Sequence, residues 1–345
     1  MWTALEVGDG RSLGIDAEVI VKGGENFMHV YGVDIGFDAV SHVRDYPWLT
    51  SWICDAVGPM KPALTVFEMP GARSRPWWLW PNLLSLDAPL VALAWQEVFA
   101  RALLPLELDW MQRGLLAVCV WLAYCGDRLL DARRLPEGPV ESDRHAFARE
   151  YSRTLIMAWG MGLVLAVVLA LQIPLRELLI GLVLLVVVAG YFALHHLQST
   201  RVRAGRWKEL MVGVGFAVGT LFFVAMDRQL TVPFLLAAAA WAGLCVMNCL
   251  MIAGWDRERD AAMAQHSLAQ RWSGMERSLP MMAIFLSALV LAASLMEGRL
   301  LPIAVVIMVS LVALLELARR PGRFSPETCH VLADVVLLTP ILTLV

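Results

Sequence analysis

Nine long apolar runs follow one another from residue 82 to the end of the chain, and they limit the fold more than any other feature of the sequence. The runs are continuous rather than alternating, which is typical of membrane-spanning helices and argues against a transmembrane barrel. They cover residues 82–104, 110–130, 155–171, 178–197, 210–225, 232–254, 279–296, 300–317 and 331–345.

The composition agrees with this pattern. The chain of 345 residues is 59% hydrophobic and 17% charged, whereas a soluble domain is about half apolar and a quarter charged. The sequence therefore predicts an all-α integral membrane protein with nine transmembrane helices around a central cavity.

The connections between the runs differ in their basic residues. Those after the second, fourth, sixth and eighth runs are long or basic, and those after the odd-numbered runs are short. Cytoplasmic loops carry an excess of lysine and arginine, so we expect the N-terminus and the basic connections in the cytoplasm, and the C-terminus on the opposite side. The basic residues are Arg133, Arg134, Arg144, Arg149, Arg153, Arg201, Arg203, Arg206, Lys208, Arg257, Arg259, Arg271, Arg277, Arg319, Arg320 and Arg323.

Residues 1–74 differ from the rest because they are Gly-rich and acidic and contain no run long enough to span a membrane. Residues 17–21 and 29–33 favour short strands between glycine turns. Two interpretations stay open, a small appended domain and a natural start at Met60. We expect a poorly structured extension over residues 1–74 and a membrane domain over residues 75–345.

The pentapeptide Asp-Arg-x-x-Asp occurs twice, at the ends of the second and sixth runs. Asp127 and Asp131 bound the first copy, and Asp256 and Asp260 bound the second. Carboxylates four residues apart lie on one face of a helix. A single copy is most often a solvated, salt-bridged turn, but charged groups beside lipid are costly and usually functional. Because both copies fall at cytoplasmic ends, the sequence predicts one site built from two halves.

The residue types in this site favour a metal and a diphosphate. Two facing carboxylate pairs can hold Mg²⁺, which takes oxygen ligands together with substrate phosphates. Nearby arginine and lysine can neutralise the remaining phosphate charge, and the apolar helix walls call for a hydrocarbon tail. The basic candidates for binding the diphosphate are Arg128, Arg133, Arg134, Arg203, Arg206 and Lys208.

These motifs resemble the UbiA superfamily of intramembrane prenyltransferases, whose members have nine helices and two Asp-rich motifs after helices 2 and 6. Asp127 and Asp131 match the last two aspartates of the first family motif, and Asp256 and Asp260 match the second. Arg75-Pro76 is similar to the Arg-Pro pair before the first family helix. The basic segment 201–208 stands where relatives carry diphosphate-binding residues.

The chain departs from the family pattern at the start of the first motif, so it is identified as a divergent member. Ala123-Tyr124 replaces the family's Asn-Asp. The Tyr124 ring is a candidate to face a carbocation, and Asn248, two turns before Asp256, is a candidate to line the cavity.

The resemblance implies an Mg²⁺-dependent prenyltransferase. We expect Asp127, Asp131, Asp256 and Asp260 to be the catalytic metal ligands. An isoprenyl diphosphate would ionise there, and the prenyl group would pass to an unidentified acceptor within the lipid bilayer; no nucleic acid is expected as a partner. Residues expected to bind the substrate are Arg128, Arg203, Lys208, Asn248 and Tyr124.

Three alternatives stay open. A terpene cyclase of the same superfamily would capture the cation within its own chain. A CDP-alcohol phosphotransferase would need an Asp-Gly-x-x-Ala-Arg motif, which the sequence lacks. A transporter with a metal or phosphate site would need polar residues and broken helices near the midplane, whereas polar groups here gather at the ends of the runs.

Other polar and small residues inside the runs have weaker signals. Asp87 lies one turn inside the first run and is a candidate to face the cavity. His195 and His196 end the fourth run and are weak catalytic candidates. Gly213, Gly215 and Gly219 favour close helix packing rather than a phosphate loop.

Overall fold

The structure is a computed structural model. The chain forms two compact units, Met1–Ser74 and Arg75–Val345. Each unit is described by itself. The residues described are 4–6, 17–22, 25–30, 33–37, 75–103, 108–134, 142–196, 207–227, 230–262, 267–272, 274–320 and 323–344.

The N-terminal unit contains a four-stranded antiparallel sheet in the order β1-β2-β3-β4. The segment expected to be a strand at residues 17–21 lies within β2. The segment expected to be one strand at residues 29–33 contains the end of β3 and the start of β4. These two strands pair with each other, His29 with Asp34 and Val30 with Val33. The strands are β1 (Ala4–Glu6), β2 (Ala17–Lys22), β3 (Glu25–Val30) and β4 (Val33–Phe37).

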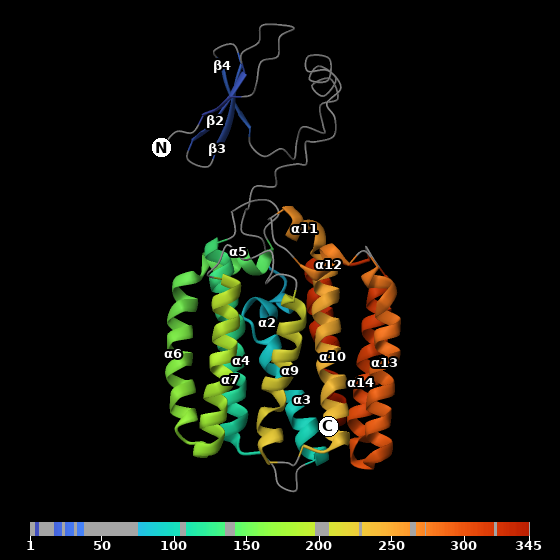
Figure 1. Ribbon diagram of the computed structural model, residues 1–345. Helices are drawn as coiled ribbons and strands as arrows, with labels where there is room; N and C mark the ends of the chain where they lie inside the picture. Colours follow the sequence, from blue (N-terminus) through green and yellow to red (C-terminus); the bar gives the residue numbers. More distant parts are fainter. Residues whose placement is uncertain are drawn as a thin grey trace. The chain divides into compact units, whose positions relative to one another are not determined.

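Long helices side by side form the second unit, with three short helices, α5, α11 and α12, at one end (Figure 1). Each predicted apolar run is largely helical where the structure describes it. The long helices are α3 (Asp87–Leu103), α4 (Trp110–Arg134), α6 (Ser152–Ala170), α7 (Leu175–His196), α9 (Lys208–Asp227), α10 (Val232–Trp255), α13 (Met275–Met296) and α14 (Leu301–Ala318). The shorter ones are η2 (Trp77–Leu79), α2 (Trp80–Leu83), α5 (Asp143–Glu150), α11 (Arg257–Ala262), α12 (Leu268–Arg271), η3 (Gly298–Leu300), α15 (Pro326–Val336) and α16 (Ile341–Leu344).

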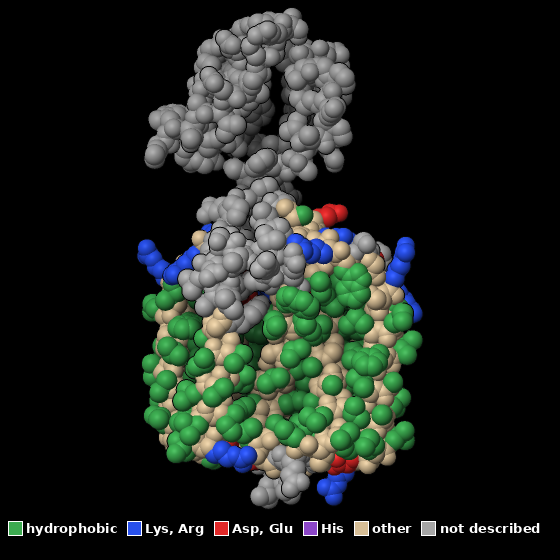
Figure 2. Space-filling model, viewed as in Figure 1, with side chains coloured by type: hydrophobic (Ala, Val, Ile, Leu, Met, Phe, Trp, Pro, Cys, Tyr) green, Lys and Arg blue, Asp and Glu red, His purple; other side chains and the backbone are tan. Residues whose placement is uncertain are grey.

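Five helices of the described residues are long and apolar enough to cross a membrane, or six if the bent pair at the start of the unit is one span. Figure 2 shows their apolar side chains as a broad belt, with basic and acidic side chains at its two edges. The expectation of a helical protein with membrane-spanning segments is therefore supported, and the count of nine spans stays a prediction.

The first apolar run is broken, which the sequence did not predict. The segments Trp77–Leu83 and Asp87–Leu103 meet at 78°. Ser85 lies between them with a φ of 58°, a left-handed conformation that a helix interior does not contain. The expectation that residues 82–104 form one continuous helix was wrong, and Asp87 is the first residue of α3 rather than an interior one.

Helix α10 is the centre of the packing, because α9, α13, α14 and α15 all contact it. Its Trp241 stacks on Trp95 of α3 with ring centroids 4.0 Å apart. The Trp95 indole N–H donates to the Leu337 carbonyl at 2.7 Å. Both rings are fully buried, so this pair ties α3, α10 and the end of α15 into one core.

The glycines of α9 do not all serve close packing. A Cβ atom added at Gly213 would lie 2.7 Å from the backbone of Val246 in α10, whereas one added at Gly215 or Gly219 would meet nothing within 4 Å. The packing expectation is confirmed for Gly213 and wrong for the other two. Backbones can approach this closely only where no side chain intervenes.

Replacing Gly213 by alanine should therefore destabilise the unit, because the Val246 backbone cannot move away from the added methyl group. Overpacking of this kind costs roughly 1–3 kcal/mol. Thermal unfolding of the purified protein in detergent would measure the loss, with Gly215→Ala as the matched control. Equal unfolding temperatures for both variants would contradict the packing assigned to Gly213.

Candidate functional site

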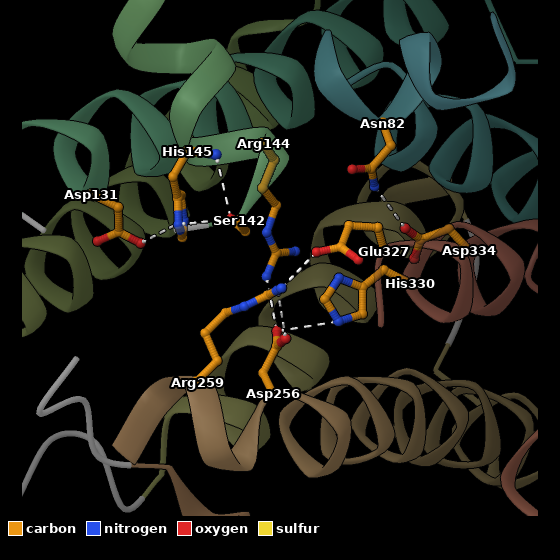
Figure 3. A network of polar contacts seen from close by, with 10 residues as sticks. All are labelled: Asn82, Asp131, Ser142, Arg144, His145, Asp256, Arg259, Glu327, His330 and Asp334. Carbon is orange, nitrogen blue, oxygen red and sulfur yellow. Dashed lines mark hydrogen bonds and ion pairs between the residues drawn. The ribbon is translucent and has the colours of Figure 1, made fainter. Parts of the chain in front are cut away.

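The second pentapeptide begins where α10 ends, and its first aspartate is the centre of a polar network (Figure 3). Asp256 directly follows Trp255, and only 5% of it is exposed. One carboxylate oxygen lies 3.3 Å from the guanidinium of Arg259, and the other lies 3.2 Å from both Arg144 and His330. Three bases from three helices therefore surround one buried carboxylate.

These bases set the protonation state of Asp256. Burial by itself would raise its pKa, but the contact with His330 and the positive charges of Arg144 and Arg259 lower it to about 2. The group is an anion at any physiological pH, as a carboxylate that binds a metal must be.

The short helix α5 joins the first pentapeptide to the second. Its cap residue, Ser142, accepts a hydrogen bond from the backbone N–H of His145, and its hydroxyl lies 2.9 Å from the Nδ1 atom of that ring. The other ring nitrogen of His145 lies 3.9 Å from the Asp131 carboxylate. The preceding residue, Arg144, contacts Asp256 at 3.2 Å. Consecutive residues of α5 thus touch both halves of the predicted site.

His145 is a neutral member of this network at pH 7. Burial and the charges of Arg144, Arg128 and Lys208 lower its pKa to about 3. Its contact with Asp131, at 3.9 Å, is therefore a dipolar contact rather than an ion pair.

Asp260 lies one helical turn beyond Asp256, whose carbonyl accepts its backbone N–H at 2.7 Å. Burial, followed by the negative charge of Asp256, raises the pKa of Asp260 to about 6, although Lys208 and Arg144 oppose that rise. Lys208, the first residue of α9, is therefore close enough to act on this end of the site.

Helix α15 adds residues that the sequence did not single out. Glu327, in its first turn, accepts a hydrogen bond from Arg259 at 2.6 Å. His330 and Asp334 follow at spacings of three and four residues, so the three lie on one face. A carboxylate such as Asp334 inside a predicted apolar run is itself a signal of function, and that signal was available in the sequence.

A second polar cluster includes Asp334. The side-chain N–H₂ of Asn82 donates to Asp87 at 2.6 Å and to Asp334 at 3.4 Å. Asn248 donates to the other oxygen of Asp334 at 3.4 Å. Arg128 of the first pentapeptide donates to the Asn82 backbone carbonyl. The cluster exists because the break at Ser85 points Asn82 back toward α3.

The structure places eight of the nine expected site residues. Asp127, Asp131, Arg128 and Tyr124 lie on α4, Asn248 on α10, Asp256 and Asp260 at α11, and Lys208 on α9. Tyr124 packs edge-on against Phe216 of α9 at 6.0 Å. Arg203 and its neighbours 201–206 lie outside the described residues, as do the side chains of His195 and His196.

The four aspartates suit Mg²⁺ by their chemistry, since it prefers hard oxygen ligands. Burial is the larger cause of the raised pKa of Asp260 and the charge of Asp256 is the next; a divalent cation beside both carboxylates would offset that second cause. Within the described ranges, however, no three acidic, histidine or cysteine side chains are grouped to hold a metal ion. Phosphate oxygens and water would have to supply the remaining ligands.

Comparison with known proteins gives no relative: no protein family, curated sequence or solved structure matches the chain.

Replacing Asp260 by asparagine should raise the unfolding temperature at pH 7.5 and flatten its pH dependence. The folded-state pKa is about 6 against an ordinary value of 3.8. The stabilising contribution of the Asp260 carboxyl group to the free energy of unfolding is therefore complete below about pH 4 and is lost as the pH rises through 6. Thermal unfolding between pH 5 and pH 7.5 without divalent cations would show the change.

Glu258→Gln is the control for this experiment, because Glu258 is an exposed carboxylate on the same helix. It should leave the slope of unfolding temperature against pH unchanged. A slope in Asp260→Asn equal to that of the wild type would show that Asp260 titrates normally.

Proposed function

We propose that this protein is an Mg²⁺-dependent intramembrane enzyme that ionises an isoprenyl diphosphate and transfers the prenyl group, as a divergent member of the UbiA superfamily. One observation carries the proposal. Arg144 and His145, adjacent on α5, connect Asp256 of one pentapeptide with Asp131 of the other. Two motifs far apart in sequence thus contribute to a single charged site at the end of an apolar bundle.

The carboxylates would bind the metal, and the basic side chains would bind the diphosphate. Asp127, Asp131, Asp256 and Asp260 would hold the metal, which neutralises charge on a departing pyrophosphate. Arg144 and Lys208, which both act on Asp260, would bind the phosphate oxygens that the metal leaves free. Arginine does so through its planar fork and lysine as a point charge.

The apolar part of the substrate would lie against the helices below this site. Tyr124 and Phe216 form an edge-on pair 6.0 Å apart, and neither residue is fully buried. Aromatic faces attract a cation, so these rings would stabilise the allylic cation once the C–O bond breaks. The packed core would keep bulk water from quenching that cation.

The same aromatic pair supports a second candidate, a membrane terpene cyclase. Rings that stabilise a cation serve intramolecular capture as well as transfer. Under either assignment the carboxylates and bases perform the same ionisation, and the two differ only in what captures the cation.

Replacing Asp256 by asparagine should lower Mg²⁺-dependent pyrophosphate release from C10 to C20 prenyl diphosphates by at least about a hundredfold. The change removes one ligand charge and the anionic partner of Arg144 and His330, while the side chain keeps its shape. Pyrophosphate release by the purified full chain in detergent micelles would measure the loss.

Asp227→Asn is the matched control, since Asp227 ends α9 and Lys208 of the site begins it. That variant should keep wild-type rates. If Asp256→Asn releases pyrophosphate as fast as the wild type, the proposed site is wrong.

A further inference from the structure

The cluster of Asn82, Asp87, Asn248 and Asp334 lies deeper in the bundle than Asp256 of the second pentapeptide, and Arg128 of the first pentapeptide contacts it through the Asn82 carbonyl. Asp334 follows His330, which contacts Asp256, by four residues on α15. Four helical residues rise about 6 Å. Asp334 is thus about one helical turn below the contact between His330 and Asp256.

The cluster presents two carboxyl groups to one another. The Asn82 side chain donates to both Asp87 and Asp334, so both carboxyl groups lie within hydrogen-bonding distance of a single nitrogen. Asp87 and Asp334 are both only partly buried.

One acceptor atom of the cluster, Oδ1 of Asn248, has no hydrogen-bond donor among the described residues. Only 6% of Asn248 is exposed, and its N–H₂ donates to Asp334. Its Oδ1 atom is buried and accepts no hydrogen bond from any residue that the structure describes. A buried acceptor without a donor costs about 1–3 kcal/mol, and a ligand carrying an O–H group would supply that donor.

We propose that Asp87 and Asp334 form a proton-accepting carboxyl pair for the second substrate, an apolar molecule whose hydroxyl group is held by Asn248. The proposal rests on the proposed function, because it assigns the capture of the cation to an external acceptor.

The chemistry balances without a further reactant. The C–O bond of the prenyl diphosphate breaks, and its electron pair leaves with pyrophosphate. The acceptor hydroxyl, which donates to Asn248 Oδ1 when the molecule binds, then turns its O–H toward the carboxyl pair. Its oxygen forms a new C–O bond to the cation, the O–H bond breaks, and the proton passes to a carboxylate of the pair. The deeper cluster thus completes the transfer that the pentapeptides begin.

The test follows two products of the same reaction. The full chain in detergent micelles is given Mg²⁺, C10 to C20 prenyl diphosphates and one of three probe acceptors: phenol, 1-naphthol or benzyl alcohol. Pyrophosphate release reports ionisation, and mass spectrometry of the organic extract reports the prenyl ether and the prenyl alcohol. The wild type should form an ether with at least one probe.

Asp334→Asn should keep pyrophosphate release within about threefold of the wild type and lower ether formation roughly a hundredfold, a loss typical of a missing general base. Prenyl alcohol should appear instead. Asp87→Asn provides a second variant with the same expectation if Asp334→Asn unfolds. Glu97→Gln is the matched control, because Glu97 is also on α3 but pairs with Arg101 and Arg113.

Each remaining outcome is decisive. Ether formation at the wild-type rate in folded variants of both aspartates would overturn the proposal. So would a parallel loss of release and ether in a folded variant, and so would a wild type that releases pyrophosphate but couples to none of the probes. A wild type that releases no pyrophosphate would instead refute the proposed function itself.

Discussion

The contact between Arg144 and Asp256 is the interaction on which the arrangement of the site depends. A buried carboxylate without a partner costs several kcal/mol, and Asp256 sits at the end of α10 with only 5% of its surface exposed. Arg144 offsets that cost from the short helix α5, which spans only Asp143–Glu150. His145, the next residue of α5, lies 3.9 Å from Asp131, so one short helix contacts both motifs.

Helix α15 connects this charged end with the interior. Glu327, His330 and Asp334 lie on one face and contact Arg259, Asp256 and Asn82 in that order. A single polar stripe therefore runs from the acidic end of the bundle to the carboxyl groups of Asp87 and Asp334. In an otherwise apolar helix such a stripe is expensive, and we infer that it aligns the two chemical steps of the proposed reaction.

Much of the helical framework was predictable, because continuous apolar runs have one low-energy structure in lipid. The pairing of Asp131 with Asp256 through α5 was not, since it depends on a loop helix with no apolar period. The break at Ser85 was hidden by the apolar residues around it, and only its φ of 58° reveals it. Gly213 and Gly215 are indistinguishable in sequence, and only the position of α10 gives them different roles.

The sequence by itself determined the helical class, the positions of the long helices and the residue types of the charged site, because hydrophobic length and side-chain chemistry are local properties. The tertiary structure alone decided which charges meet. It placed Arg144 between the two motifs, turned Asn82 toward Asp87, and brought Asp334 beside Asn248. These contacts join residues from 5 to 112 positions apart, and such pairings follow from how the helices pack rather than from any pattern along the chain.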